Sequence, residues 1–251
     1  MVAKNILITG ASSGIGAALA RFYAAPESRL VLWGQNAERL AVTAEQCRAR
    51  GAAFETACFD LTDFGQLVRA LEETDARSPL DLAFFNAGLG GSLPRDRAAQ
   101  DAQAAERMAG VNFTAPVMAA NLIAERMAER GRGRIVLIGS VAASFPLPMA
   151  PVYAGSKAGL ALFAEALGLR LAKYGVGVTL VSPGFVDTPM SRGLKEPRPF
   201  LIKPDAAAAI IAGKVERGVR HIVLPWQFAV LRAAAMLVPR PIMRAVLSRL
   251  L

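Results

Sequence analysis

Short apolar runs alternate with longer amphipathic stretches along the whole chain of 251 residues, and this alternation restricts the possible folds more than any other feature. Most of the apolar runs are continuous, which is typical of strands covered by helices on both faces. The seven runs predicted as strands are 5–9, 30–33, 53–59, 81–85, 134–139, 177–182 and 221–225. Strands joined through helices by right-handed crossovers form a parallel sheet. We therefore predict a doubly wound α/β fold with seven parallel strands and helices on both faces.

Six helical patterns lie between the predicted strands. They cover 14–25, 36–50, 64–75, 98–130, 152–173 and 204–217. Glycines stand just past the fourth and fifth patterns, as they do at helix ends. In sheets of this kind, ligands bind at the carboxyl ends of the strands, where the strand order reverses. We therefore expect the functional residues in the loops that follow the strands.

The rare residue types restrict the chemistry that the chain can use. Cys47 and Cys58 fall in ordinary helix and strand patterns, so we expect neither a disulfide framework nor a metal site. His221 is the only histidine in the sequence. A zinc cluster, or a Ser-His-Asp triad with additional histidines, is therefore not expected. The apolar run at the N-terminus is shorter than a secretory signal requires, so a cytoplasmic protein is expected.

The loop after the first predicted strand, "TGASSGIG" at 9–16, is rich in glycine. Gly10 would allow a tight turn, Gly14 would let the backbone approach a ligand, and Gly16 would let the next helix pack closely on the sheet. The helix N-terminus then offers unpaired N–H groups and a partial positive charge to a pyrophosphate. No Gly-Lys-Ser/Thr sequence follows, so this is not a Walker A loop. A purely structural turn is the alternative, but the position between strand and helix favours a dinucleotide site.

Tyr153 and Lys157 begin the helical pattern after the fifth predicted strand, and their spacing places them on one helix face. A phenol has a pKa of about 10, and a nearby ammonium stabilises the phenolate. The pair could therefore exchange a proton with an alcohol or ketone while a hydride moves to or from a cofactor. The small residues at 154–156 would leave room for a nicotinamide ribose. A surface tyrosine beside a solvated lysine is the structural alternative.

Several motifs follow one another in a fixed order: "TGASSGIG", "FNAG" at 85–88, Asn112, Ser140 and "YAGSK" at 153–157. In order and spacing they closely resemble the motifs of the short-chain dehydrogenase/reductase family, over about residues 4–190. The resemblance implies a Rossmann-like fold and an NAD(P)-dependent oxidoreductase that interconverts an alcohol and a ketone or aldehyde. The chain departs from the family at Phe85, where a second asparagine often stands, and we interpret this as a packing variation at a strand end.

The resemblance also implies roles for single residues. Tyr153 would be the general acid/base, and Lys157 would lower its pKa and bind the nicotinamide ribose. Ser140 would position the substrate and stabilise the oxyanion, and Asn112 would hold a proton-relay water. Asp60 would bind the adenine amine, although an N-cap would look the same. The residues implied to bind the cofactor are Gly10, Ser12, Ser13, Gly14, Ile15, Gly16, Gly34, Gln35, Asn36, Asp60, Leu61, Asn86, Ala87, Gly88, Tyr153, Lys157, Pro183, Gly184, Val186 and Thr188.

Two other functions are weighed against the enzyme. A catalytically silent protein that binds a dinucleotide as a sensor or scaffold is the main alternative, but such proteins commonly lose the tyrosine or the lysine. Nucleic-acid binding would use the basic C-terminal part, which shows neither a known motif nor an interleaved aromatic pattern. We therefore expect an enzyme that binds no nucleic acid.

The choice between NAD and NADP depends on the residues after the second predicted strand. A carboxylate there would bind the 2′-hydroxyl of NAD, whereas an arginine would bind the 2′-phosphate of NADP. The chain has Gly34, Gln35 and Asn36 at this point, with neither a carboxylate nor a cation. Gly34 leaves room for a phosphate, and Arg39 follows one turn into the helix. The sequence therefore favours NADP but leaves NAD open.

Apolar side chains dominate the segments expected around the substrate. They are Phe145, Leu147, Met149, Phe185 and Met190, and they favour an apolar or lipid-like alcohol or carbonyl compound. Residues 1–225 are predicted to form one dinucleotide-binding and catalytic domain, with a mobile substrate lid at about 184–204. The helical pattern 152–173 is apolar around much of its circumference, so we expect a homodimer or homotetramer.

The last part of the chain is basic and apolar. Residues 1–190 hold 18 basic and 17 acidic side chains, whereas residues 191–251 hold 11 basic and 3 acidic ones. Residues 226–251 contain no acid and are predicted to form a helical extension of the same domain. Their apolar runs are shorter than the ~20 residues of a spanning helix. The extension is expected either to pack over the substrate site or another subunit, or to lie in the inner membrane face as short amphipathic helices.

Overall fold

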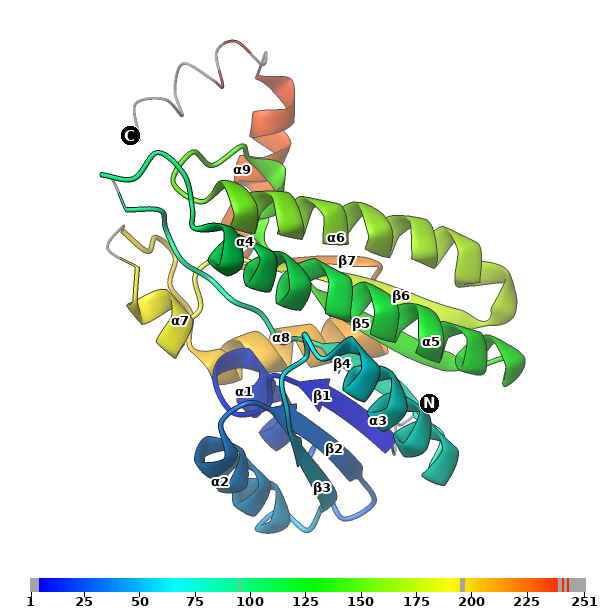
Figure 1. Ribbon diagram of the computed structural model, residues 1–251. Helices are drawn as coiled ribbons and strands as arrows, with labels where there is room; N and C mark the ends of the chain where they lie inside the picture. The colour runs from blue at the N-terminus through cyan, green and yellow to red at the C-terminus, as the bar shows by residue number, and fades with distance from the viewer. Residues whose placement is uncertain (1–4, 95, 195–196, 239–240, 242, 244–251) are drawn as a thin grey trace.

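The computed structural model describes residues 5–94, 96–194, 197–238, 241 and 243. Seven parallel strands form one sheet in the order β3-β2-β1-β4-β5-β6-β7 (Figure 1). The strands are β1 (Asn5–Thr9), β2 (Arg29–Gly34), β3 (Ala53–Cys58), β4 (Leu82–Phe85), β5 (Gly133–Ile138), β6 (Val176–Pro183) and β7 (His221–Leu224). All seven predicted strands are confirmed. The strand order reverses between β1 and β4, so these two strands mark the expected ligand side.

Two layers of helices cover the sheet, as predicted for a doubly wound fold. One buried cluster joins the sheet to α1 (Gly14–Tyr23), α2 (Ala37–Arg48) and α8 (Pro204–Glu216). A second cluster joins the other face to α3 (Phe64–Arg77), α5 (Ala115–Glu129) and α6 (Pro151–Leu171). Successive residues of β1 alternate between the two: Ile6 and Ile8 belong to the first and Leu7 to the second. The central strands are therefore buried on both faces, which explains their continuous apolar sequences, whereas the edge strand β3 has no fully buried residue.

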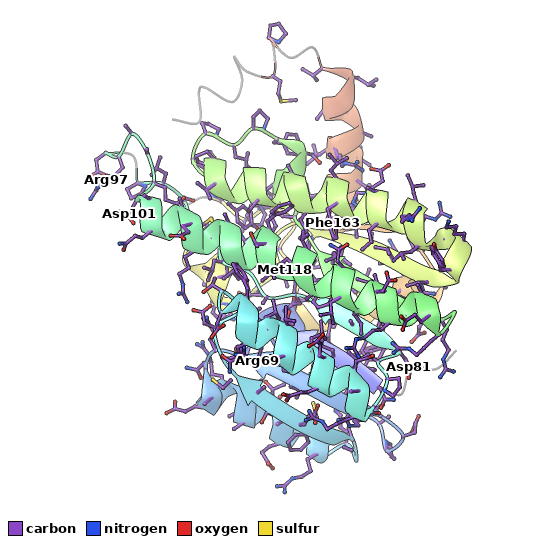
Figure 2. The ribbon with its side chains drawn as sticks, turned by 45° about the vertical axis from the view of Figure 1, so that its right-hand side comes forward. Arg69, Asp81, Arg97, Asp101, Met118 and Phe163 are labelled. Atoms are coloured by element: carbon purple, nitrogen blue, oxygen red, sulfur yellow. The ribbon has the colours of Figure 1, made fainter. Side chains whose placement is uncertain are left out.

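The predicted single helix 98–130 is wrong in two respects. The first helix of this region is α4 (Ala102–Ala109), which begins four residues later than predicted, directly after Asp101 (Figure 2). The Asp101 side chain caps it by accepting a hydrogen bond from the Ala104 N–H. The predicted helix is also interrupted by the π-helical segment η1 (Gly110–Thr114) before α5 continues it. A π-helical turn adds one residue without ending the helix, so the apolar pattern runs through it.

The remaining helical segments lie near the carboxyl ends of the strands or at the end of the chain. They are η2 (Val141–Ser144), η3 (Ala172–Tyr174), α7 (Pro189–Arg192) and α9 (Trp226–Leu237). Figure 1 shows α9 projecting from the body of the domain beyond α6. The predicted extension is thus helical over 226–237, while Arg240, Arg244 and Arg249 lie outside the described residues. Within the part that the structure describes, no helix has the length and apolar character needed to cross a membrane.

Candidate active site

The glycine-rich loop is shaped by close backbone contacts at the end of β1. Gly10 has a φ of +69°, and a Cβ there would lie 2.9 Å from the Ala87 Cα. A Cβ at Gly16 would lie 2.3 Å from the Gly10 carbonyl oxygen, so a side chain cannot be accommodated. Gly14 has a φ of +57° and packs against Thr188. The three glycines are therefore required by geometry, and Gly16 lets the first turn of α1 pack closely against the backbone of Gly10, directly after β1.

Hydrogen bonds join this loop to the end of β4. The Thr9 hydroxyl oxygen accepts from the Asn86 N–H at 3.0 Å and from the Ala87 N–H at 3.1 Å. The Asn86 side-chain amide donates to the Thr9 carbonyl oxygen at 3.0 Å and to the Gly10 carbonyl oxygen at 3.4 Å. The two strands at the reversal of strand order therefore present one rigid edge to a ligand.

A cavity of about 570 Å³ lies at this edge. The loops after β1, β2, β4, β5 and β6 all contribute to its walls, so the cavity lies where the doubly wound fold predicts. Most of the predicted cofactor and catalytic residues line it, namely Gly10, Ser12, Ser13, Gly14, Ile15, Gly34, Gln35, Asn36, Leu61, Asn86, Ala87, Gly88, Ser140, Tyr153, Lys157, Pro183, Gly184, Val186 and Thr188. Gly16, Asp60 and Asn112 do not line it.

Tyr153, Lys157 and Ser140 share the wall formed by α6 and the end of β5. Lys157 is 4% exposed, and its Nζ donates to the Ile138 carbonyl oxygen at 2.9 Å. Burial lowers the pKa of Lys157 to about 8. Burial raises the pKa of the Tyr153 phenol, and a hydrogen bond with Ser140 opposes this shift. In the chain alone, the pKa of Tyr153 is thus shifted in the direction opposite to the one that Lys157 was expected to cause.

Asn112 supports the site from behind the cavity wall. It is fully buried in η1, where its side-chain oxygen accepts from the Leu89 N–H at 2.8 Å and its amide donates to the Leu89 carbonyl oxygen at 2.9 Å. The amide also contacts the Ser156 hydroxyl at 3.3 Å, and that hydroxyl donates to the Tyr153 carbonyl oxygen at 2.8 Å. The side chain therefore joins the loop after β4 to the first turn of α6. Its implied role in holding a water stays a prediction.

Asp60 has partners that the sequence did not suggest. Its carboxylate accepts from the Thr62 N–H at 2.9 Å and from the Thr62 hydroxyl at 2.8 Å, and it pairs with Arg107 of α4 at 2.8 Å. The N-cap of α3 is Asp63 instead, which accepts from the Gln66 N–H at 2.9 Å. The N-cap alternative for Asp60 is therefore wrong, and adenine binding by Asp60 stays a prediction.

Three aromatic residues of the cavity wall were missed by the sequence analysis. Trp33 at the end of β2 and Phe59 after β3 form an edge-to-face pair, with ring centroids 5.1 Å apart, beside Gly34. Phe228 of α9 also lines the cavity, next to Gly184. Each looks like an ordinary core residue in the sequence. Only the position of Trp33 and Phe59 at strand ends could have indicated them.

The apolar residues predicted around the substrate are all found in the cavity wall. They are Phe145, Leu147, Met149, Phe185 and Met190. They come from the segment after Ser140 and from the segment after β6, and both segments contribute to the same cavity. Among the described lining residues, Arg39 and Lys157 are cationic and none is acidic. The cavity therefore combines an apolar part with a positive potential.

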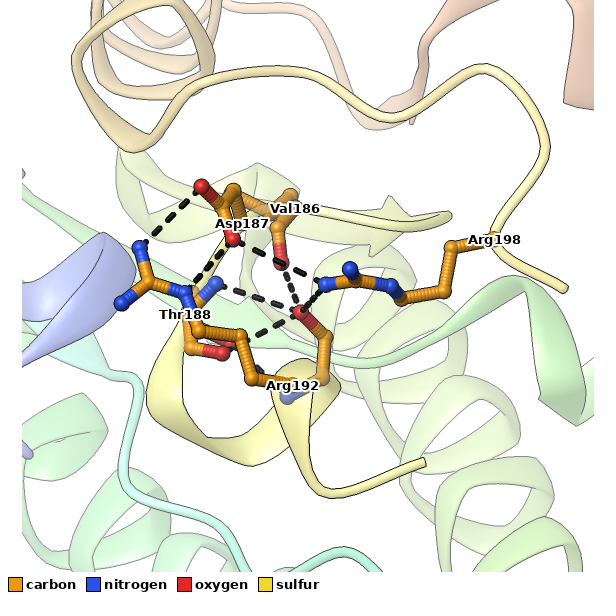
Figure 3. Close-up of polar contacts among 6 residues, drawn as sticks. Val186, Asp187, Thr188, Arg192 and Arg198 are labelled. Atoms are coloured by element: carbon orange, nitrogen blue, oxygen red, sulfur yellow. Dashed lines mark hydrogen bonds and ion pairs between the residues drawn. The ribbon is translucent and has the colours of Figure 1, made fainter. Parts of the chain in front are cut away.

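The segment predicted as a lid is held by polar contacts in its described residues (Figure 3). Asp187 binds Arg192 through two hydrogen bonds of 2.8 and 3.1 Å, and Arg198 lies 3.6 Å from the same carboxylate. The Ser191 hydroxyl donates to the Val186 carbonyl oxygen at 2.6 Å. These bonds join the residues before and after α7 to α7 itself, beside the cavity. Its predicted mobility stays a prediction.

Comparison with known proteins agrees with this geometry. Residues 4–199 match the family described as short chain dehydrogenase. An uncharacterised oxidoreductase of Myxococcus xanthus is 32% identical over 251 residues, which cover 98% of this chain and 97% of the relative.

Two solved structures have the same architecture. A short-chain dehydrogenase of Sphingobium yanoikuyae in complex with NADPH has a TM-score of 0.81 and 27% identity, and the match covers 93% of each chain. The bulky-bulky ketone specific alcohol dehydrogenase of Comamonas testosteroni has a TM-score of 0.79 and 27% identity, and the match covers 96% of each chain. The fold, the arrangement of the site and these relatives lead to one conclusion: this chain is an oxidoreductase that belongs to the short-chain dehydrogenase/reductase family.

Proposed function

We propose that the protein interconverts an alcohol and a ketone or aldehyde with a nicotinamide dinucleotide, and that Tyr153 is the general acid/base. One observation carries the proposal. Tyr153, Lys157 and Ser140 line the same cavity as the glycine-rich loop, so proton-transfer groups and a phosphate-binding loop face one space. A related short-chain dehydrogenase of this fold holds NADPH.

The residues of the chain fit a dinucleotide. Ser13 is the N-cap of α1 and makes no capping hydrogen bond through its side chain, which leaves the first-turn N–H groups available to a pyrophosphate. Gly10 and Gly14 keep side chains out of this approach. The described lining residues carry two cations and no acid, which suits an anionic ligand. A bound nicotinamide would supply the hydride donor or acceptor.

Three side chains would then take part in proton transfer to and from the substrate oxygen. The Tyr153 phenol donates its proton to the oxygen during reduction and takes it back during oxidation. Ser140, which is hydrogen-bonded to Tyr153, orients the oxygen and stabilises its developing charge. The Lys157 ammonium and a positive nicotinamide ring both favour the phenolate. We propose that together they overcome the burial that raises the pKa of Tyr153 in the chain alone.

NADP is the proposed cofactor. Arg39 lines the cavity beside Gly34 and also lines a neighbouring pocket with Ser12 and Ser13. Its backbone bonds with Asn36 and Thr43, but within the part of the chain that the structure describes its guanidinium has no hydrogen bond or ion pair. An unpaired guanidinium next to the position expected for the adenosine ribose suits a 2′-phosphate.

The proposed substrate is an apolar, bulky or lipid-like carbonyl compound. The aromatic, leucine and methionine side chains around Tyr153 offer little to hydrogen-bond a polar substrate beyond its reacting oxygen. The related Comamonas testosteroni enzyme is described as specific for bulky-bulky ketones, which supports the same class here.

We also propose that the protein acts in the cytoplasm as a homodimer or homotetramer, and that the extension contacts the inner face of the membrane. On α6, Leu162 is 71% exposed and Leu169 is 67% exposed. Helices α5 and α6 lie side by side on the face seen in Figure 2, where Met118 and Phe163 are labelled. Burying these leucines against a second copy would remove a large apolar area from water.

Replacing Tyr153 with Phe tests the proposed function. The variant Tyr153→Phe keeps the ring but cannot donate a proton, so kcat should fall by about 10²–10⁴-fold. NADPH consumption with a panel of apolar ketones measures the rate, and a fluorescence titration measures NADPH binding, which should stay unchanged. A variant that keeps the wild-type rate would show that Tyr153 is not the acid/base.

The same panel separates the enzyme from a silent binding protein. A wild-type chain that binds NADPH tightly but consumes none with any ketone or aldehyde would favour the sensor or scaffold. Measurable turnover that is lost in Tyr153→Phe would exclude this alternative.

A further inference from the structure

The first turn of α9 places one aromatic ring into the cavity wall. Phe228 is 8% exposed, whereas Trp226 is 69% and Val230 is 56% exposed. Helix α9 also packs against η2, the turn that directly follows Ser140. The C-terminal helix is therefore attached to the catalytic part of the molecule by this side, and Phe228 is its buried contact with the cavity.

Phe228 lies directly on the backbone at Gly184, where β6 has ended. A Cβ at Gly184 would lie 2.2 Å from the Phe228 Cε2 and 2.4 Å from its Cδ2. No side chain can occupy that position while the ring is in place. The Gly184 N–H donates to the Leu224 carbonyl oxygen at 2.7 Å, just before α9 begins. The ring therefore closes the cavity at a point fixed by β6 and β7.

Two further phenylalanines hold Phe228 from both arms of the segment 185–202. The Phe185 ring centroid lies 6.0 Å from that of Phe228, and the Phe200 centroid lies 5.7 Å away, both in edge-to-face geometry. Phe200 has a φ of +56°, an uncommon conformation for a residue with a side chain, which persists only where surrounding contacts fix it. Its contact with Phe228 is one such contact.

The two arms are also joined to each other. The Ile202 N–H donates to the Phe185 carbonyl oxygen at 3.1 Å, and the Asp187 N–H donates to the Ile202 carbonyl oxygen at 2.9 Å. Between the arms, Met190 and Leu194 line the cavity. The described arms 185–194 and 197–202 are thus joined where Phe185 and Asp187 meet Ile202, residues of the first arm line the cavity, and Phe228 packs against both arms.

We propose that Phe228 is a positioning residue that holds the described arms 185–194 and 197–202 closed over the substrate, and that it thereby sets the size of carbonyl compound that the site admits. The ring occupies space that a bulkier substrate would need, and it fixes the loop that carries Met190 and Leu194. The size limit rests on the proposed function, whereas the closed state of the segment does not.

Limited proteolysis tests the closed state without any substrate. Trypsin cleaves after Arg192, which lies inside the segment and is bound to Asp187. Where opening is fast, cleavage follows the population of the open segment. Phe228→Ala should speed cleavage at the Arg192–Gly193 bond by at least about tenfold, because it removes the ring between the two arms. Phe228→Leu keeps apolar bulk and should give a smaller increase.

A matched control comes from the same helix. Leu231 is 48% exposed and does not line the cavity, so Leu231→Ala should cleave at the wild-type rate. Circular dichroism must show that each variant is folded. If Phe228→Ala does not fold, Phe228→Leu replaces it in the test. A folded Phe228 variant that is cleaved no faster than Leu231→Ala would overturn the proposal.

The size limit is measured with acetophenone and benzophenone as one-ring and two-ring ketones, with NADPH as reductant. Phe228→Ala should raise the ratio of kcat/KM for benzophenone to that for acetophenone by about tenfold, with NADPH affinity unchanged. An unchanged ratio would refute the size limit. If no variant reduces either ketone but cleavage still rises only in the Phe228 variants, the proposed function fails for these substrates while the closed state of the segment stands.

Discussion

At the scale of single residues, Lys157 shows how burial changes a functional group. Its ammonium is enclosed by the cavity wall and has the Ile138 carbonyl oxygen as a hydrogen-bond partner. A hydrogen bond to a neutral carbonyl replaces only part of the hydration that the ammonium loses on burial. The protonated form is therefore disfavoured, and the pKa of Lys157 falls to about 8. The folded chain without cofactor therefore releases this proton at a lower pH than the unfolded chain does.

This difference predicts how stability depends on pH. Between about pH 8 and the ordinary lysine value of about 10.4, the unfolded chain binds the Lys157 proton and the folded chain does not. The free energy of unfolding should therefore rise with pH across this window. Urea denaturation of the wild type and of Lys157→Met at several pH values measures the effect. The difference between the two isolates Lys157 from other titrating groups, and equal pH dependence in both proteins would contradict the prediction.

Arg39 is the residue on which the choice of cofactor should depend. Replacing it by Ala removes a charged partner of the proposed 2′-phosphate, so the Kd of NADPH should rise by about 10–100-fold, as expected for loss of a hydrogen bond to a charged group. The Kd of NADH should stay nearly constant. Arg48→Ala is the control, because Arg48 lies on the same helix and pairs with Glu45.

Fluorescence titration of the wild type and both variants with each nucleotide, at one fixed ionic strength, gives the six dissociation constants needed. Equal weakening of NADPH and NADH would show that Arg39 acts on both nucleotides rather than on the phosphate. Tighter binding of NADH than of NADPH by the wild type would overturn the proposed preference itself.

At the scale of elements, the strands and most helices could be predicted because their apolar patterns depend on burial alone. The central strands are buried on both faces and have continuous apolar sequences, and all seven predicted strands were found. The interruption at η1 could not be predicted, since a π-helical turn leaves the apolar pattern intact. What fixes it in place is the pair of bonds between Asn112 and the backbone of Leu89, a contact across 23 residues.

Some residues of the site could be predicted from the local sequence, and others depend on contacts between distant parts of the chain. The glycine-rich loop, Ser140 and Tyr153 follow strands or begin helices, so their positions in the sequence already place them on one edge of the sheet. Phe228 could not be assigned to the site in this way, because its role depends on the packing of α9 against the backbone at Gly184. The partnership of Asp60 with Arg107 is likewise a contact between distant elements.

At the scale of the whole molecule, helix α9 has two different sides. One side carries Phe228 into the cavity wall, as expected if the extension packs over the substrate site. The other side exposes Trp226, Val230 and Leu237 to solvent. The chain from 226 to 251 has four arginines and no acid. Packing over the site therefore uses one side of α9 only and leaves an apolar surface of the helix available for the proposed membrane contact.

This surface predicts salt-dependent binding to anionic membranes. Apolar side chains bury into the interface, and each basic residue near an anionic surface contributes about 1 kcal/mol, which salt weakens. The protein should sediment with phosphatidylserine vesicles at low salt, less so at high salt, and not with phosphatidylcholine vesicles alone. Replacing both Trp226 and Val230 by Ser should weaken binding and leave turnover unchanged, because neither residue lines the cavity. Folded wild-type protein that stays in the supernatant with anionic vesicles at low salt would exclude the membrane contact and leave α9 as a wall of the substrate site.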